Sequence, residues 1–206
     1  ENVFDLSLGN PVVEPPKQVR QAIRSAANDT APGLHRYMPN AGLNDVRNAI
    51  ARSISVESNV KLTADHIVMV CGAAGGLNIT LKTLLDPGEE VIVFSPFFVE
   101  YLFYAENHGG KTIIVPTHEN FSLNFDTLRE ALSPKTKAVI INSPNNPTGV
   151  VYPKEMLEKL ASILQQHTSN TGNQVYLISD DPYKKIVFDG VETSNILELY
   201  ENSIYI

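Results

Sequence analysis

The sequence has little cysteine and no long apolar run, and each of these absences excludes a class of protein. The single cysteine, Cys71, cannot form an internal disulfide framework, and this scarcity is typical of a reducing, cytoplasmic location. No apolar run approaches the roughly twenty residues that a membrane helix needs, so we expect no membrane partner. The first residues carry no basic segment, and a signal peptide is therefore not predicted.

Basic residues are scarce as well. The 206 residues include 16 Lys and Arg against 23 Asp and Glu, which gives a net charge of −7 and leaves no basic block. A surface for nucleic acid is therefore not expected. This length gives room for one substantial core, or for one domain and a piece of another.

Short apolar runs alternate with segments of helical periodicity along most of the chain. Six runs predict strands buried on both faces, at residues 67–70, 91–94, 112–115, 138–141, 175–178 and 203–206. Apolar residues that share one face predict helices within residues 43–54, 77–85, 98–105, 128–132 and 157–164. The polar residues 165–173 predict a surface loop. This alternation favours an α/β domain with a mainly parallel sheet.

Residues 1–36 do not share this alternation. They are rich in proline and contain one predicted short helix, near residues 17–27. We interpret them as an N-terminal arm and part of a small domain, and residues 37–206 as a larger domain. The chain closes on residues 203–206, which predict a strand with no turn after it. Since a domain rarely stops within a strand, we expect a fragment of a longer polypeptide that is truncated at its C-terminus.

Polar side chains follow two of the predicted strands at their carboxyl ends, where open α/β sheets bind ligands. Asn146 follows the run at 138–141 and offers both a donor and an acceptor, although Asn and Pro are also expected in a simple turn. Asp180 and Tyr183 follow the run at 175–178. A carboxylate there could hold a proton on a pyridine nitrogen, and a phenol could bind a ring hydroxyl. Asp180 could instead pair with its neighbour at a metal ion, or serve as a loop carboxylate.

Two other segments are candidates for ligand contacts. Gly72, Ala73 and Ala74 open a predicted helix, where small residues let backbone N–H groups approach an anion; tight packing of strand and helix would explain them equally. Phe97 and Phe98 follow a predicted strand, and either ring could cover the face of a planar ligand or belong to the core.

Taken together, these motifs resemble the class I and II aminotransferases that use pyridoxal 5′-phosphate (PLP). The similarity runs in order over nearly the whole chain and rests on residues 8–11, 37–43, 72–74, 95–98, 145–149 and 180–183. It implies the PLP-binding large domain of fold type I, with a mainly parallel sheet in α/β/α layers. It also implies a ping-pong reaction in which an amino acid leaves its amine on the cofactor and a 2-oxo acid collects it.

The resemblance assigns roles around the cofactor ring. Asp180 is expected to pair with the pyridinium nitrogen, which keeps the ring cationic and able to accept electrons. Asn146 and Tyr183 are expected to hydrogen-bond the ring's 3′ oxygen, and Phe98 to stack on the ring, where many relatives carry Trp or Tyr. The family also suggests cis peptide bonds before Pro96 and Pro147.

The resemblance assigns contacts around the phosphate and the substrate as well. The loop at Gly72 is expected to bind the phosphate through the backbone amides of Ala73 and Ala74. Tyr37 of the partner subunit is expected to reach the same phosphate, which implies a homodimer with shared sites. Gly9, together with Asn146, is expected to lie beside the substrate.

Several family features are missing from the sequence. The lysine that forms the Schiff base with PLP, and the arginine that grips the substrate carboxylate, are both expected beyond Ile206, so no catalytic residue is assigned in the chain. Lys184 and Lys185 do not match the position of that lysine. We therefore expect that these 206 residues alone do not transaminate, whereas the parent protein does. Ala73 and Ala74 offer the phosphate only backbone N–H groups, and they do not favour specificity for aspartate.

Three alternatives to an aminotransferase stay open. The first is another enzyme on the same scaffold, such as a β-lyase or a decarboxylating synthase. The second is a regulatory ligand-binding module that is not catalytic, for which the sequence offers no helix-turn-helix or basic segment. The third is a truncated domain that does not fold alone and aggregates through an exposed strand edge.

Overall fold

The computed structural model describes Gly9 and residues 13–206, and the chain divides into two compact units, Glu1–Pro39 and Asn40–Ile206. The first unit contains helix α1 (Lys17–Ala27), none of whose residues is buried. The short helix predicted near residues 17–27 is thus confirmed. The boundary between the units lies between residues 39 and 40, a few residues beyond the position chosen from the sequence. The nature of residues 1–36 as an arm and part of a small domain stays a prediction.

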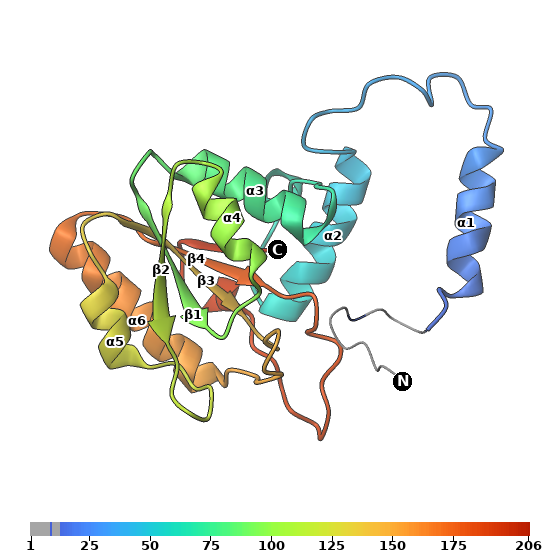
Figure 1. Ribbon diagram of the computed structural model, residues 1–206. Coiled ribbons are helices and arrows are strands. Elements are labelled where there is room, and N and C mark those ends of the chain that lie inside the picture. The colour runs from blue at the N-terminus through green and yellow to red at the C-terminus, as the bar shows by residue number, and fades with distance from the viewer. Residues whose placement is uncertain (1–8, 10–12) are drawn as a thin grey trace, which may run out of the picture. The chain divides into compact units, whose positions relative to one another are not determined.

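The second unit is built on a five-stranded parallel sheet (Figure 1). Its strands are β1 (Glu90–Ser95), β2 (Lys111–Pro116), β3 (Thr136–Asn142), β4 (Tyr176–Asp180) and β5 (Ser203–Tyr205). They lie in the order β2-β1-β3-β4-β5, so the chain changes direction across the sheet between β2 and β3. Five of the six predicted strands and the parallel arrangement are confirmed.

Helices cover both faces of the sheet (Figure 1). The helices of this unit are α2 (Asn44–Ser58), α3 (Gly72–Leu84), α4 (Glu100–Glu106), α5 (Phe125–Ala131) and α6 (Lys154–Thr171), with short 3₁₀ turns η1 (Ala64–His66) and η2 (Ile196–Glu198). Helix α5 starts at Phe125, because the side chain of Asn124 accepts hydrogen bonds from two backbone N–H groups of its first turn.

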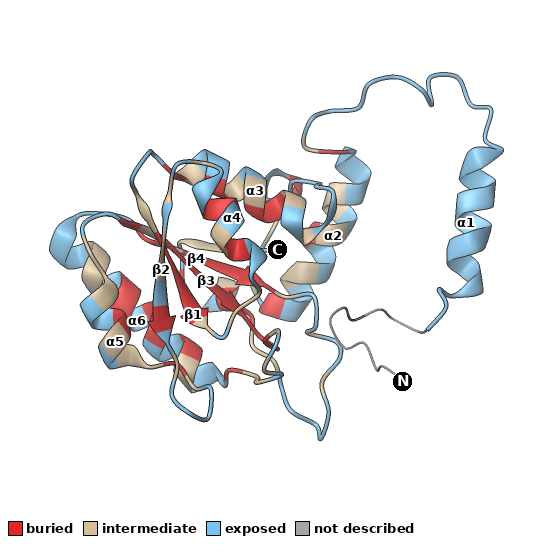
Figure 2. Cartoon of the chain, in the orientation of Figure 1, coloured by how far each residue is buried: buried red, intermediate tan, exposed pale blue. Residues whose placement is uncertain are grey.

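Alternate residues of the strands enter two separate cores, one on each face of the sheet. Val139 and Ile141 of β3 pack into the core beneath α5 and α6, whereas Ala138 and Ile140 pack into the core beneath α3 and α4. Figure 2 shows the central strands almost wholly buried between these layers. The predicted α/β/α arrangement follows, because a strand buried on both faces needs helices on both sides.

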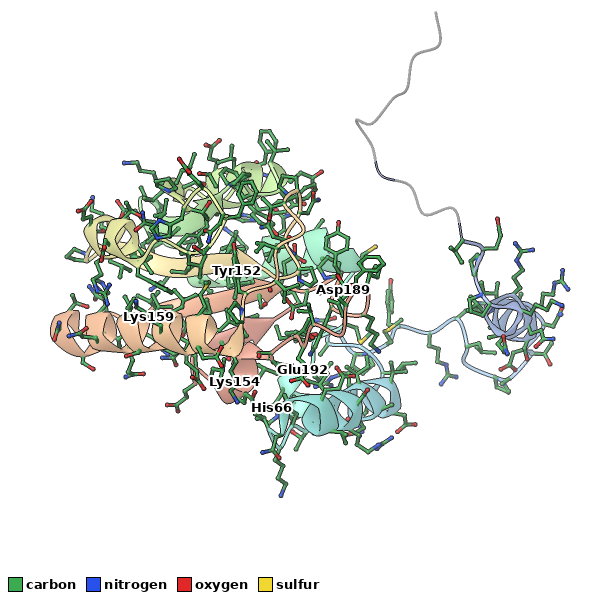
Figure 3. All side chains as sticks on the ribbon, turned by 90° about the horizontal axis from the view of Figure 1, so that it is seen from below. His66, Tyr152, Lys154, Lys159, Asp189 and Glu192 are labelled. Atoms are coloured by element: carbon green, nitrogen blue, oxygen red, sulfur yellow. The ribbon has the colours of Figure 1, made fainter. Side chains whose placement is uncertain are left out.

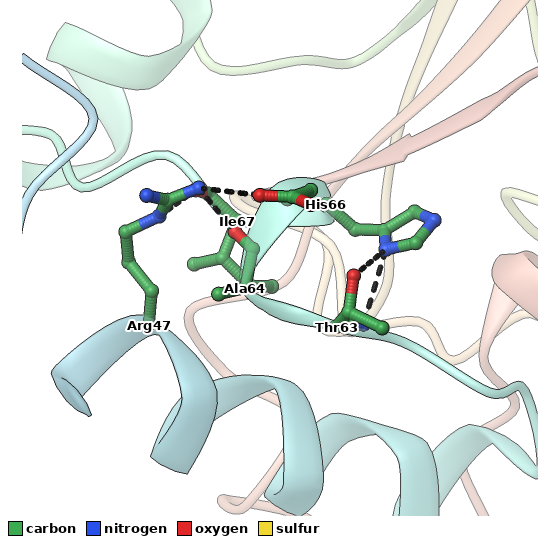
Figure 4. A network of polar contacts seen from close by, with 6 residues as sticks. Arg47, Thr63, Ala64, His66 and Ile67 are labelled. Atoms are coloured by element: carbon green, nitrogen blue, oxygen red, sulfur yellow. Dashed lines mark hydrogen bonds and ion pairs between the residues drawn. The ribbon is translucent and has the colours of Figure 1, made fainter. Parts of the chain in front are cut away.

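The strand predicted at residues 67–70 is not formed. The segment follows η1, and its backbone hydrogen bonds outside helices and strands run from the Ile67 N–H to the Ala64 carbonyl, 3.1 Å, and from the Met69 N–H to the Ala41 carbonyl, 2.9 Å. Arg47 of α2 donates to the carbonyls of Ala64 and Ile67, the latter at 2.8 Å, as Figure 4 shows. These contacts tie the segment to α2. The apolar run was therefore a wrong sign of pairing with a strand and of full burial, because Val68 is 59% exposed, Met69 40% and Val70 36%.

The surface loop predicted at residues 165–173 is wrong for most of its length. Helix α6 continues to Thr171 and ends at Gly172, whose φ of 74° is the left-handed conformation that glycine adopts without strain. The last turns are polar because they extend beyond the core, and polar residues such as Gln form helices readily. Lys159 extends from α6 (Figure 3), and its ammonium nitrogen lies 4.7 Å from the centre of the Phe125 ring of α5.

Candidate functional site

The carboxyl ends of β3 and β4 adjoin a cavity of about 200 Å³. In the register of these strands, Asn142 at the end of β3 is the partner of Asp180 at the end of β4. The cavity is lined by Ala73, Ala74, Leu77, Phe98, Glu100, Tyr101, Tyr104, Asn142, Asn146, Asp180, Pro182 and Tyr183. Six of the residues singled out from the sequence are thus gathered in one place, although they come from four separate segments.

Asp180 is the most deeply buried acid of this cavity, with 6% of its surface exposed. Its Oδ2 accepts a hydrogen bond of 2.7 Å from the phenol of Tyr101, whereas its Oδ1 is buried and has no partner. Burial raises the pKa of this carboxyl, and the hydrogen bond from Tyr101 opposes the rise. A buried oxygen without a donor is costly, so Oδ1 is suited to a ligand that brings one.

Asn146 and Tyr183 face each other across the cavity. The side-chain amide of Asn146 donates to the Tyr183 phenol at 3.5 Å, the upper limit for a hydrogen bond. Tyr183 is 37% exposed, so its hydroxyl is open to solvent on one side. Because their mutual hydrogen bond is long, both groups can donate instead to an oxygen atom of a ligand.

Aromatic rings form another wall of the cavity. Phe98 and Tyr101 meet edge to face, with their ring centres 5.9 Å apart and their planes at 81°. Next to them, the Tyr104 phenol donates to the Glu100 carboxylate, and burial, followed by this hydrogen bond, raises the pKa of Tyr104 to about 12. Both tyrosines therefore act as hydrogen-bond donors at neutral pH.

The start of helix α3 borders the same cavity through Ala73 and Ala74. Cys71 precedes the helix and its side chain makes no capping hydrogen bond, so the N–H groups of the first turn lack a side-chain acceptor. Gly72 has a φ of 72°, a conformation that a side chain would strain. An uncapped helix start of this kind attracts an anion.

Gly72 itself lines a different and larger cavity, of about 560 Å³, which it shares with Ala73. That cavity lies between α2, α3, the segment 67–70 and the residues around β5, and most of its lining is aliphatic. Since it holds no carboxylate and no pair of facing polar side chains, we place the chemistry in the smaller cavity.

Two predicted site residues lie in the first unit. Gly9 and Tyr37 are both exposed. Of the segment 8–11 that contributed to the resemblance, only Gly9 belongs to the described residues. Their roles stay predictions.

The two lysines after Tyr183 do not line the cavity. Lys184 is largely buried, and its ammonium nitrogen lies 3.6 Å from the Glu57 carboxylate and 5.3 Å from the centre of the Tyr205 ring. Lys185 is exposed. Neither lines the cavity, and no other lysine among residues 13–206 does so.

Asp181 lies beside the site without lining the cavity. Burial raises its pKa to about 6, against the hydrogen bond from Ser179, 2.7 Å, and the charge of Lys184. In the described part of the chain, Asp180 and Asp181 belong to no group of three or more His, Cys, Asp and Glu side chains that could bind a metal ion.

The sequence reasoning did not single out four residues that line the cavity. Tyr101, Tyr104 and Glu100 lie on or at the start of α4, and Asn142 ends β3. The spacing of Phe98 and Tyr101, one helical turn apart, is a signal that could have identified Tyr101. The others carry no signal of their own, because only the packing of α4 on the sheet brings them to the site.

Comparison with known proteins decides the family. The sequence profile described as Aminotransferase class I and II matches residues 1–204. The chain belongs to this family. Its predicted membership is confirmed.

Individual aminotransferases are similar over nearly all of the chain. A probable aspartate/prephenate aminotransferase of Thermus aquaticus is 37% identical over 191 residues, which are 92% of this chain and 48% of that relative. An aminotransferase from Eubacterium rectale has a TM-score of 0.95 at 35% identity, over 99% of this chain and 52% of that one. Aspartate aminotransferase from Thermus thermophilus, solved with maleate, has a TM-score of 0.85 at 36% identity, over 97% and 50%. The predicted fold is therefore confirmed.

The chain spans about half the length of the curated relatives that it matches. None of the helices in its described part has the length and apolar character that crossing a bilayer requires. The cis peptide bonds predicted before Pro96 and Pro147 are present, and a third precedes Pro144.

The family implies PLP as the cofactor, and the residues of the smaller cavity fit it. The unpartnered Oδ1 of Asp180 suits a protonated ring nitrogen, because it is a buried acceptor with no donor of its own. The facing amide of Asn146 and phenol of Tyr183 suit an oxygen on the ring. The ring of Phe98 suits a planar ligand, and the uncapped start of α3 suits a phosphate.

Proposed function

We propose that this chain supplies the PLP-binding site of an aminotransferase whose parent protein moves an amino group between an amino acid and a 2-oxo acid. The observation that carries the proposal is the buried, unpartnered Oδ1 of Asp180, which faces a cavity that also contains Asn146, Tyr183 and Phe98. A carboxylate in this setting favours a cation beside it, and a pyridinium N–H is a cation with one hydrogen to donate.

Each residue of the site has a binding task in this proposal. Asp180 holds the proton on the ring nitrogen, and Tyr101 keeps the other carboxyl oxygen occupied. Asn146 and Tyr183 orient the ring through its 3′ oxygen, and Phe98 covers one face and excludes water from it. When bound, PLP supplies an electron-accepting ring, and the chain's contribution is to fix its position and its charge.

The phosphate is bound by the backbone N–H groups of Ala73 and Ala74, in the loop that Gly72 opens. Since alanine adds no hydroxyl or ammonium, binding depends on the helix start and on a further donor. We assign that donor to Tyr37 of the partner subunit, so a homodimer with shared sites is part of the proposal. Gly9 and Asn146 are assigned to substrate binding. The parent protein is assigned to the cytoplasm.

The relatives narrow the substrate class only in part. They include enzymes named for aspartate, prephenate and aromatic amino acids, and one relative was solved with maleate, a dicarboxylate. We propose an amino acid as donor and a 2-oxo acid as acceptor, and we assign no particular side chain. The cofactor-attaching lysine and the substrate-carboxylate arginine are placed beyond Ile206, so the chain alone is not expected to transaminate.

Titration of the 206-residue chain with PLP tests the proposal, with absorbance and fluorescence as readouts. Asp180→Asn should weaken binding by about tenfold to a hundredfold, because it removes a charge-assisted hydrogen bond. Asp181→Asn is the matched control, since Asp181 follows Asp180 in the sequence but does not line the cavity. Equal affinities of the two variants, or no saturable binding by the unsubstituted chain, would overturn the assignment.

A further inference from the structure

Asn142, the last residue of β3, is 3% exposed and lines the cavity, yet the proposed cofactor contacts give it no task. Its side-chain amide makes two short hydrogen bonds. The Nδ2 group donates to the backbone carbonyl of Asp180 at 2.6 Å, and the Oδ1 atom accepts from the backbone N–H of Asn146 at 2.6 Å. One amide thus joins the two polypeptide segments that carry the candidate ring-binding side chains.

Only one orientation of this amide satisfies both partners. A carbonyl can only accept and a backbone N–H can only donate, so turning the amide over would place donor against donor and acceptor against acceptor. Because Asn142 is buried, water cannot replace either partner without entering the sheet. The two bonds therefore fix the backbone of Asn146 relative to that of Asp180.

The position of Asn146 depends more on its backbone hydrogen bond to Asn142 than on its side-chain contact with Tyr183. Its amide meets the Tyr183 phenol only at 3.5 Å, whereas its backbone is held at 2.6 Å by Asn142. The ladder between β3 and β4 ends at the pair of Asn142 and Asp180, so no strand bond continues to Asn146. The side chain of Asn142 extends the connection between the two segments to Asn146, four residues further along the chain.

We propose that Asn142 is a positioning residue that couples the two ring contacts, Asp180 and Asn146, by clamping their backbones together. Its effect on cofactor binding rests on the proposed function, whereas the clamp itself does not. Removing the clamp leaves both side chains present but lets Asn146 move away from the ring oxygen. The variant should therefore lose the binding contribution of the 3′ oxygen and keep the other contacts with PLP.

The experiment compares Asn142→Leu and Asn142→Asp with the control Asn145→Leu in the 206-residue chain. Asn145 lies in the same loop and accepts hydrogen bonds from Thr148, at 3.1 Å from the N–H and 2.8 Å from the hydroxyl, but it does not line the cavity. The first readout, without cofactor, is hydrogen exchange of the Asn146 amide by NMR. Asn142→Leu should speed exchange by about tenfold, and Asn142→Asp less, because an acceptor oxygen remains.

The second readout is the ratio of affinities for PLP and for its 3-deoxy analogue, which lacks the ring oxygen. Asn142→Leu should reduce this ratio by about fivefold or more, and Asn145→Leu should leave it unchanged. Unchanged exchange at Asn146 in Asn142→Leu overturns the clamp, and so does a ratio that falls equally in the control. If the unsubstituted chain does not bind PLP, the proposed function fails, and the exchange measurement alone decides the role of Asn142.

Discussion

Tyr101 donates a 2.7 Å hydrogen bond to Asp180, across 79 residues of sequence, and so links helix α4 to the end of strand β4. The bond leaves Oδ1 as the only free oxygen of that carboxyl. It also opposes the rise in the pKa of Asp180 that burial causes. A single phenol therefore leaves Oδ1 available to a ligand and favours the ionised form of the carboxyl.

Replacement of Tyr101 by phenylalanine tests this relationship. Tyr101→Phe should raise the pKa of Asp180 further, since burial then acts without the opposing hydrogen bond, and should cost about 1–3 kcal/mol of stability at pH 7. The titration of the Asp180 carboxyl carbon by NMR and urea unfolding measure the two effects. Tyr104→Phe is the control, because its hydroxyl donates to the exposed Glu100; a matching shift of Asp180 in that variant would contradict the expectation.

The buried carboxyl of Asp181 should make the stability of the chain depend on pH. Burial raises its pKa from the ordinary 3.8 to about 6, so between these values the folded chain holds more protons than the unfolded chain. The free energy of unfolding should therefore fall as pH rises from about 4 to about 6, by on the order of 1–3 kcal/mol from this group. Urea unfolding at several pH values should show that Asp181→Asn lacks this component.

The control for that experiment is Asp126→Asn, at a side chain that is 96% exposed. Its pH curve should run parallel to that of the unsubstituted chain. If Asp181→Asn also runs parallel between pH 4 and 6, the buried carboxyl does not contribute as inferred.

Two adjacent glycines of α3 should respond oppositely to alanine. A Cβ at Gly76 would lie 3.0 Å from Cγ2 of Ile206 and 3.4 Å from Cγ2 of Val70, whereas a Cβ at Gly75 would lie 3.9 Å from its nearest neighbour. Gly75→Ala should stabilise the chain by about 0.5–1 kcal/mol through helix propensity. Gly76→Ala should destabilise it by about 1 kcal/mol or more, because overpacking outweighs that gain. Thermal unfolding gives both values, and a stabilised Gly76→Ala would show that Ile206 and Val70 yield easily.

Lys184 should not attach covalently to PLP. Its ammonium group is paired with Glu57 and lies over the Tyr205 ring, away from the cavity. After addition of PLP and reduction with borohydride, peptide mapping should find no lysine labelled selectively, while reversible binding persists. Stoichiometric labelling of Lys184 or Lys185 would mean that the alignment of residues 180–183 with the family is wrong and that the chain is catalytic as it stands.

Local sequence pattern predicted the framework because its causes are local. Runs of apolar residues marked β1 and β3 correctly, since a strand buried on both faces must be apolar throughout. The same rule failed at residues 67–70, because apolar character alone does not bury a run: Val68, Met69 and Val70 are exposed there. It failed again at residues 165–171, where α6 continues into solvent without an apolar face.

The sequence by itself determined that polar groups stand at the ends of β3 and β4, and that small residues open α3. It also determined the family, because the motifs keep their order along the chain. Only the tertiary structure decided that Tyr101 meets Asp180 and that Asn142 joins Asp180 to Asn146. The reason is physical: these contacts depend on how helices pack on the sheet and on the register of parallel strands, and both are set by segments far apart in the chain.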